Sequence, residues 1–442
     1  MKKATKISDI YRVFKPEPLP ISDLANFYID CYDVRGNEKF RAKMLRRLTD
    51  SGEFRHILFV GYKGCGKSTE LNYLQKDLEE RNFLVINFSV RTELNPLDFS
   101  YIEFIIATMG QLFEHAQKNS IRINKTFFKN IETWLRDKEV SEVFEKYNIS
   151  GELNGGAEAK VNLPFLAKIF AKFKIVAKSS KSLKETLTQT IEPKLADLIE
   201  YCNDLITEIN LSLQRDNKTS LVFIIEDMDK IPRKVSGALF FDYGATLRQL
   251  KANFIFTFPI ALYHDARFQT IDANFDDHSI LPMIKVKNKD GSIYQQGVKA
   301  ITKIVEKRMD LSLFKDSTQL PELISLSGGV LRDLFRLIGE AAEFALDANN
   351  NQISEQNITD SINKLKADYK NNIADNPENH LTVNDYYDAL IQLATNPNKD
   401  VDNTQAVLDL RQNLSILAYN GEGWYDLHPL IRIILKERGR IE

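Results

Sequence analysis

The sequence predicts an α/β fold in which a parallel β-sheet is covered by helices. Three observations support this prediction. A short apolar run at 56–60 leads into a glycine-rich loop and then into a segment with helical spacing. Further apolar runs of strand length alternate with longer helical patterns as far as about residue 286. Parallel strands that alternate with helices form a sheet that is buried on both faces.

The expected elements follow in order along the chain. The chain begins with a polar, proline-punctuated stretch at 14–20, which favours an extended strap, and a helix follows at 37–48. The first strand, 56–60, precedes a helix at 68–81. The other strands are expected at 83–88, 221–225, 252–258 and 280–286. Helices are expected over most of 101–217, apart from a turn-rich segment at Gly151–Gly156.

After Asp290 the pattern changes to helices alone. These helices are expected at about 295–312, 319–326, 330–347 and 354–372. A last small unit combines helices with Gly421–Tyr425, which is typical of a hairpin or wing. We therefore expect an N-terminal strap and helix (1–50), an α/β domain with a helical, basic insert at about 119–215 (51–290), a helical unit (291–375) and a winged-helix-like domain (376–442).

Composition restricts the function classes. The chain has 442 residues and a net charge of −2, whereas a protein that coats nucleic acid non-specifically is usually strongly basic. Its three cysteines include no CxxC pair, which argues against a disulfide framework or a zinc site and suits a reducing compartment. No apolar run is long enough to span a bilayer. We expect a cytoplasmic protein without membrane association.

One segment matches a phosphate-binding loop (P-loop) in full. The residues from Gly61 to Ser68 have the pattern G-x-x-x-x-G-K-S between an expected strand and an expected helix. Such glycines let successive backbone N–H groups point at phosphate oxygens. Lys67 would reach the β- and γ-phosphates, and the Ser68 hydroxyl would coordinate Mg²⁺. The residues expected to bind ATP, or less readily another nucleoside triphosphate, are Gly61, Gly64, Cys65, Gly66, Lys67, Ser68 and Thr69.

An acidic pair follows another buried strand. Glu226 and Asp227 come directly after the apolar run 221–225, at the edge where ligands bind in parallel sheets. One acid would hold the Mg²⁺ shell, and the other would orient the attacking water. If Glu226 serves the metal, the water-orienting acid is Asp227, which is one methylene shorter than the usual Glu and leaves room for slow hydrolysis. An acidic turn at a strand end is the structural alternative.

Two further side chains are candidates near the γ-phosphate. Thr257 lies near the end of the expected strand 252–258, where a hydroxyl can bond the phosphate or the lytic water. A half-buried strand threonine explains this residue equally well. Arg332 follows a Ser-Gly-Gly segment in the first turn of a helix, from which its guanidinium can reach over a phosphate. The alternative is a solvated surface arginine.

These motifs resemble an AAA+/STAND ATPase, and the nearest likeness is to origin-recognition and initiator ATPases. The resemblance rests on the P-loop, the acidic strand end, the Thr257 strand and the Ser-Gly-Gly-x-x-Arg helix. It implies a five-stranded sheet with the Thr257 strand between the P-loop strand and the Glu226 strand. It also implies a helical lid that carries Arg332, a C-terminal winged helix and ATP-driven self-association into a homo-oligomer.

The resemblance extends to two other residues and fails at a third place. Tyr28 lies where such ATPases pack the adenine, and it could stack on the base or be pinned to the core. His428 matches a histidine that touches the β-phosphate of ADP in STAND winged helices, but Pro429 replaces the expected acid. A core or capping histidine is therefore the better interpretation. Working AAA+ rings present an arginine before the last strand; Arg267 is the only near candidate here, which favours a switch over a motor.

A basic segment lies inside the insert. Between 159 and 184 there are lysines but no acids, and three phenylalanines interleave with them. This composition favours nucleic acid, an anionic partner surface or a membrane face, although a solvated helix face is the commoner explanation. The residues are Lys160, Lys168, Lys172, Lys174, Lys178, Lys181, Lys184, Phe165, Phe170 and Phe173.

Three functions are consistent with this sequence. The first is a switch that binds MgATP, hydrolyses it slowly and controls assembly or a separate effector protein, with anti-phage defence or signalling as its setting. The second is a DNA-binding initiator- or transposition-type ATPase. Its support is a basic C-terminal cluster of Arg432, Lys436, Arg438 and Arg440. The third is a scaffold that binds ATP without hydrolysing it, which Asp227 would permit.

Overall fold

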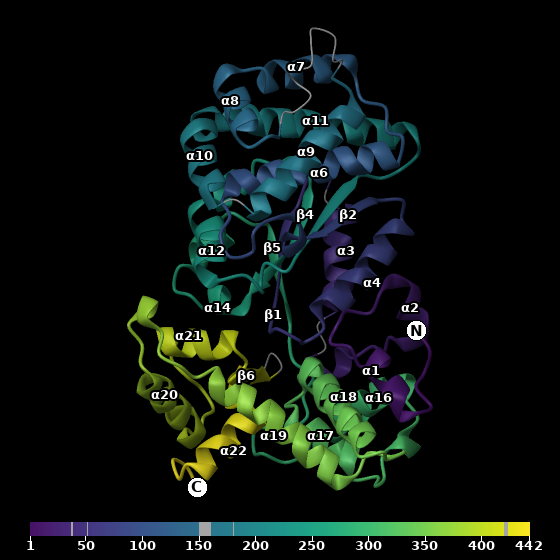
Figure 1. Cartoon of the computed structure of the whole chain (residues 1–442), viewed down its shortest axis with the longest axis vertical. Coiled ribbons are helices and arrows are strands. Elements are labelled where there is room, and N and C mark those ends of the chain that lie inside the picture. Colours follow the sequence, from purple (N-terminus) through teal and green to yellow (C-terminus); the bar gives the residue numbers. More distant parts are fainter. Residues whose placement is uncertain (37–38, 51, 150–160, 180, 420–422) are drawn as a thin grey trace.

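The computed structural model describes residues 1–36, 39–50, 52–149, 161–179, 181–419 and 423–442. An α/β unit with a helical insert occupies one end of the molecule, and two smaller units lie side by side at the other end (Figure 1). We call the helical unit after residue 290 the lid, and residues 376–442 the C-terminal unit. The turn-rich segment expected at 151–156 and Lys160 lie outside the described residues.

A five-stranded parallel sheet forms the core of the α/β unit, in the order β2-β3-β4-β1-β5. The strands β1, β3 and β4 are buried along almost their whole length, as expected for parallel strands that helices cover. Because β4 lies between β1 and β3, the expected position of the Thr257 strand is confirmed. The strands are β1 (His56–Gly61), β2 (Leu84–Ser89), β3 (Leu221–Glu226), β4 (Asn253–Pro259) and β5 (Asp277–Leu281).

The fifth strand differs from the prediction. It spans Asp277–Leu281, so the expected strand at 280–286 was wrong over most of its length. After Leu281 the chain leaves the sheet, and the N–H of Lys285 donates to the carbonyl of Val34 at 3.0 Å. Met283 and Ile284 are buried all the same. Their apolar character serves packing between the sheet and the lid, a purpose that a short sequence run cannot distinguish from a strand.

The N-terminal strap is anchored beside the P-loop helix α4 (Lys67–Glu79). The backbone N–H of Leu19 donates to Thr69 Oγ1 at 3.1 Å, and Asn72 Nδ2 donates to the carbonyl of Leu19 at 2.8 Å. The strap is flanked by two short helices that the sequence did not predict, α1 (Ile7–Val13) and α2 (Ile21–Phe27). The expected helix at 37–48 is α3 (Phe40–Asp50).

The insert stacks on the end of the α/β unit that is remote from the lid (Figure 1). Phe165, Phe170 and Phe173 of helix α9 are buried, so they are not free to stack on bases. This favours the solvated-face interpretation of the basic segment. The helices of this part are α5 (Val90–Glu93), α6 (Tyr101–Lys118), α7 (Lys125–Leu135), α8 (Lys138–Lys146), α9 (Leu163–Ser179), α10 (Lys181–Ile191) and α11 (Leu195–Arg215), with a 3₁₀ turn at Glu192–Lys194.

Short helices connect the later strands, and four longer ones build the lid, close to their expected positions. No helix among the described residues has both the length and the apolar character needed to cross a membrane. The connecting helices are α12 (Arg233–Gly237), α13 (Gly244–Leu247), α14 (Ile260–Tyr263) and α15 (Phe268–Asp272), and Ala238–Asp242 forms a π-helical turn. The lid helices are α16 (Gln295–Arg308), α17 (Gln319–Leu326), α18 (Leu331–Asp347) and α19 (Glu355–Asn371).

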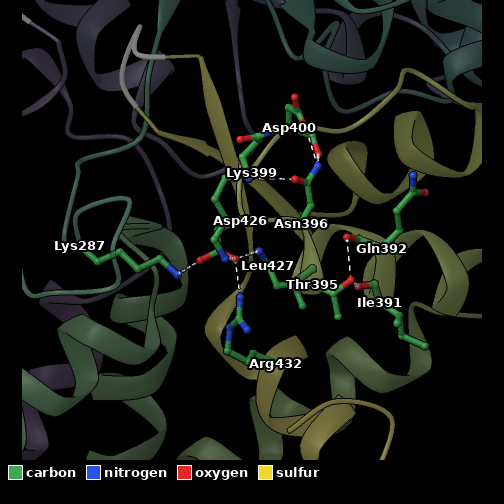
Figure 2. A network of polar contacts seen from close by, with 11 residues as sticks. Lys287, Ile391, Gln392, Thr395, Asn396, Lys399, Asp400, Asp426, Leu427 and Arg432 are labelled. Carbon is green, nitrogen blue, oxygen red and sulfur yellow. Dashed lines mark hydrogen bonds and ion pairs between the residues drawn. The ribbon is translucent and has the colours of Figure 1, made fainter.

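The C-terminal unit contains three helices and a two-stranded antiparallel hairpin, as the sequence predicts. A buried carboxylate fastens this unit to the segment between β5 and the lid. Asp426 accepts from Lys287 Nζ at 2.5 Å and from Arg432 at 2.6 Å (Figure 2). The identity of the C-terminal unit as a winged helix stays a prediction. The elements are α20 (Val383–Thr395), α21 (Gln405–Gln412), β6 (Ile416–Tyr419), β7 (Trp424–Leu427) and α22 (Pro429–Glu437).

Candidate nucleotide-binding site

The P-loop curls between the end of β1 and the start of α4. Gly64 and Gly66 have φ values of +79° and +106°, which side-chain-bearing residues rarely adopt. Gly66 is the N-cap of α4, and no side chain caps the helix. The first N–H groups of α4 are therefore directed at the loop, where an anion can accept from them.

Lys67 is buried at the centre of the loop and paired with an acid. Its Nζ donates to the carbonyls of Gly61 and Tyr62 at 2.8 Å and lies 2.8 Å from a carboxylate oxygen of Asp229. Burial alone would raise the pKa of Asp229, but the ammonium groups of Lys67, Lys230 and Lys63 together outweigh burial and hold that pKa below its usual value. A bound triphosphate would have to take over the charge of Lys67 from Asp229.

The predicted acidic pair lies at the carboxyl end of β3, beside the P-loop. Glu226 is largely buried, which raises its pKa, and the nearby Ser68 hydroxyl partly offsets this. Asp227 has a φ of +68°, a left-handed conformation that aspartate tolerates better than most residues. Its two carboxylate oxygens contact Ser89 Oγ and Lys230 Nζ, each at 2.5 Å.

This arrangement decides the fold. A P-loop at the end of β1 faces an acidic strand end on β3, with β4 between the two strands. The chain has a P-loop NTPase fold.

Sequence comparisons leave the family open, because no family model and no curated protein matches this chain. The solved structures that resemble it over nearly the whole chain include the following three. The Walker-type ATPase PABY2304 of Pyrococcus abyssi is 12% identical with a TM-score of 0.44, over 96% of this chain and 99% of that one. The ORC2 protein of Aeropyrum pernix in its ADPNP-ADP complexes is 10% identical with a TM-score of 0.45, over 97% and 98%. The ORC1 protein of the same organism, in complex with DNA, is 10% identical with a TM-score of 0.39, over 97% and 96%.

The donor set of this P-loop NTPase fits a magnesium nucleotide. Ser68 and Glu226 line one polar cavity, so one cation there could contact both oxygens. Mg²⁺ typically takes one or two protein oxygens and completes its shell with phosphate and water. Among the described residues no group of three or more His, Cys, Asp or Glu side chains could hold a metal by itself. The phosphates would therefore supply part of the shell.

The lid brings Arg332 to the P-loop. The backbone N–H of Arg332 donates to the carbonyl of Gly64 at 3.3 Å. A Cβ built on Gly64 would lie 2.7 Å from the Cβ of Arg332, so only glycine allows this approach. Arg332 lines the same cavity as Lys67 and Ser68. The structure thus places Arg332, which is far from the P-loop in sequence, within this pocket.

Thr257 is engaged elsewhere. Its hydroxyl donates to the carbonyl of Ile225 at 3.2 Å and accepts from the N–H of Met228 at 3.0 Å. It is buried, and it ties β4 to the turn that follows β3. This geometry gives Thr257 a part in holding that acidic turn, and a direct contact with the γ-phosphate stays a prediction.

Apolar side chains also line the cavity and would suit a base. Phe27, Leu331 and Phe335 line it together with Tyr28. The hydroxyl of Tyr28 donates to Glu70 at 3.1 Å, and its ring lies 4.8 Å from that of Tyr73. Burial, and then Glu70, raise the pKa of Tyr28. Tyr28 is thus pinned to the core on one side while it lines the cavity, and stacking of its ring on a base stays a prediction.

His428 does not line the cavity. It is fully buried, and its Nδ1 accepts from the N–H of Leu430 and caps α22. Its ring stacks on Tyr369 at 4.2 Å, and its Nε2 lies 3.3 Å from Asp333, the residue after Arg332. His428 therefore contacts the lid, which is the place of a core and capping histidine.

Arg267 pairs within its own turn. Its side chain contacts Asp265 at 2.9 Å and lies over the ring of Phe241. The side chain is otherwise largely exposed. A contact between subunits stays a prediction for this residue.

Sequence reasoning missed three residues of the site. Asp229 and Lys230 follow Glu226 and Asp227 after one residue, Met228, so a third acid in four positions was an available signal. Arg35 is 5% exposed, lines the cavity, and donates to the carbonyl of Cys65 at 2.7 Å. Its position beside the P-loop depends on the folded N-terminal segment, so nothing local in the sequence reveals it.

Proposed function

We propose that this chain is an MgATP-dependent switch that hydrolyses ATP slowly and moves its C-terminal unit in response. The observation that carries the proposal is the double role of Asp229. Its carboxylate neutralises Lys67 of the P-loop, while its backbone carbonyl accepts from Gln412 Nε2 of the C-terminal unit at 3.1 Å. One residue therefore contacts both the phosphate-binding lysine and the unit that would move.

Two more contacts support the same coupling. Arg233, in the helix after the acidic turn, pairs with Asp409 of α21 at 2.9 Å. Tyr62, inside the P-loop, is 2% exposed and lies near Arg411 and Tyr425 of the C-terminal unit. The P-loop is thus contacted by the lid on one side and by the C-terminal unit on the other.

The residues suggest a sequence of events. Lys67 exchanges Asp229 for the β- and γ-phosphates, and Arg332 binds the phosphates from the lid. Ser68 and Glu226 would hold Mg²⁺, and the bound ion would supply positive charge to the phosphates. In hydrolysis the oxygen of water bonds to Pγ and the bond from Pγ to the bridging oxygen breaks. ADP leaves with the electron pair, and Asp227 accepts a proton from the water.

Steady-state ATP turnover, with Lys67→Ala as the background, tests this proposal. We expect turnover well below one per second that Lys67→Ala abolishes. Turnover of one per second or faster would contradict a slow switch. Turnover equal to that of Lys67→Ala, together with tight ATP binding, would favour the scaffold instead. Failure to bind ATP at all would overturn every ATP-dependent function.

A DNA-binding initiator-type role is the second candidate, and we place it ahead of an effector in defence. Its support is an exposed basic end of the chain: the guanidinium groups of Arg438 and Arg440 lie over the ring of Tyr387 at 4.9 and 4.6 Å, and Lys436 is exposed beside them. Arg432 is different, because it pairs with buried Asp426. A separate effector, self-association and a cytoplasmic location stay predictions.

The sharp test of DNA binding leaves Arg432 intact. A triple variant, Lys436→Ala, Arg438→Ala and Arg440→Ala, should lose salt-dependent affinity for duplex DNA without unfolding. The matched control is Lys299→Ala, Lys303→Ala and Lys307→Ala, which removes three exposed charges from α16 of the lid. Equal affinity of both triple variants would argue against this surface.

A further inference from the structure

Lys230 lies between two cavities that meet at the P-loop. It lines the cavity that contains Lys67 and Arg332. It also lines a second, polar cavity on the other side, together with Ser68, Glu226 and Asp227. Of the acidic turn, only Lys230 lines both. An ammonium group in this place lies where the terminal phosphate of a nucleotide in the first cavity would approach the acids of the second.

The ammonium of Lys230 is at present committed to Asp227. The two groups are 2.5 Å apart, with side-chain exposures of 26% and 17%. A turn fixes the pair, since the N–H of Lys230 donates to the carbonyl of Asp227 at 3.0 Å. Because Ser89 occupies the other carboxylate oxygen, Asp227 has both oxygens engaged. In this state it is poorly placed to accept a proton from water.

The charges around the turn favour an exchange of partners. Lys230 also lies close enough to Glu226 and Asp229 to stabilise their charged forms, so it is attracted to acids on several sides. A γ-phosphate carries more charge than one carboxylate and offers several oxygens, so it can compete with Asp227 for the ammonium. ADP lacks that group and cannot compete in the same way.

We propose that Lys230 binds the γ-phosphate of ATP and thereby releases Asp227 to act on the attacking water. This inference rests on the proposed ATPase function and adds a discrimination step to it. Lys230 makes the triphosphate, and not the diphosphate, the ligand that frees the acid. When Lys230 leaves Asp227 for the γ-phosphate, the same movement would recognise ATP and free Asp227 to act as the base.

The two partners of the pair give opposite predictions. Lys230→Met removes the γ-phosphate contact, so the preference for a non-hydrolysable ATP analogue over ADP should fall at least about tenfold, and hydrolysis should fall with it. Lys230→Arg keeps a cation and should retain most of the preference. Asp227→Asn removes the competitor, so affinity for the analogue should rise severalfold while hydrolysis is lost. Affinity for ADP should change little in all three variants.

Fluorescent analogues of ATP and ADP, titrated into the full chain with Mg²⁺, provide the measurement. Lys234→Met, an exposed residue of α12, is the matched control and should behave as the unchanged protein. Unchanged ADP affinity in Lys230→Met would show that the P-loop is still folded. The inference is overturned if Lys230→Met keeps the preference, or if Asp227→Asn weakens binding of the ATP analogue. A protein that binds neither nucleotide would overturn the proposed function as well.

Discussion

The ammonium of Lys67 and the carboxylate of Asp229 form a buried ion pair 2.8 Å long at the centre of the P-loop. Both side chains are almost wholly shielded from water, at 5% and 4% exposure. A buried lysine needs a counter-charge, and here the protein supplies one of its own. Nucleotide binding is therefore an exchange of anions at Lys67, and the strength of this pair sets part of the affinity.

Asp229→Asn should lower the stability of the nucleotide-free protein but raise its affinity for nucleotide. Removing one partner of a buried pair costs about 3–5 kcal/mol, so the nucleotide-free protein should melt at a lower temperature. Loss of the competing carboxylate should tighten nucleotide binding by roughly tenfold. Thermal unfolding with and without saturating MgADP measures both effects. Asp347→Asn, at an exposed position of α18, is the control. Weaker binding by Asp229→Asn would contradict the exchange.

Arg332→Ala should weaken ATP binding by about tenfold to a hundredfold, because a charge-assisted contact with phosphate contributes roughly 1.5–3 kcal/mol. Arg336 lies one turn further along α18 and pairs with Asp368 instead of lining the cavity. Arg336→Ala should therefore bind ATP nearly as well as the unchanged protein. Titration with a fluorescent ATP analogue compares them. Equal losses in both variants would indicate a general effect on the lid.

His428→Ala should act on stability more than on the ligand. The histidine fills a buried place against Tyr369 and Asp333, so truncation should lower the free energy of unfolding by about 2–4 kcal/mol. Affinity for ADP should change less than fivefold, apart from unfolding. Chemical denaturation and ADP titration measure the two quantities. A large loss of ADP affinity at unchanged stability would instead place His428 at a phosphate.

Glu103 predicts a pH-dependent stability. Burial raises the pKa of this carboxyl, which is 1% exposed, to about 7 from its ordinary value of 4.5. The folded state thus favours the neutral form. The resulting stabilisation is complete below about pH 4.5 and is lost as the pH rises through 7, a change of about 3 kcal/mol. Glu103→Gln should flatten the dependence of the melting temperature between pH 5 and 7.5. Parallel curves for both proteins would contradict this.

The sequence predicted most of the fold, because its signals there are local. The P-loop is a contiguous motif, and β3 is a continuous apolar run that ends in acids. The order of the strands followed from the resemblance and not from periodicity. The end of β5 was misjudged, because Met283, Ile284 and Val286 are buried outside the sheet, where Ile284 packs against Gly329 of the lid.

The site was less predictable, since its contacts join distant parts of the chain. The hydroxyl of Thr257 had a plausible ligand, but two backbone groups of the neighbouring strand end occupy it. Nothing near Asp229 in sequence indicates that its carboxylate pairs with Lys67, which lies 162 residues earlier in the chain. Which acid pairs with Lys67 and which with Lys230 depends on the folded turn, and composition does not encode that turn.

The turn before Arg332 has a mechanical consequence. The carbonyl of Gly328 accepts from the hydroxyl of Tyr419 in the hairpin, and a Cβ on Gly329 would lie 2.0 Å from the carbonyl oxygen of Ile284. His428 contacts Asp333, and Lys366 pairs with Glu437, so several contacts join the lid to the C-terminal unit. The two units should therefore move together as one rigid body. Dyes on α19 and α20 would then keep a constant separation through the ATP cycle, while dyes on α20 and α11 would move apart or together.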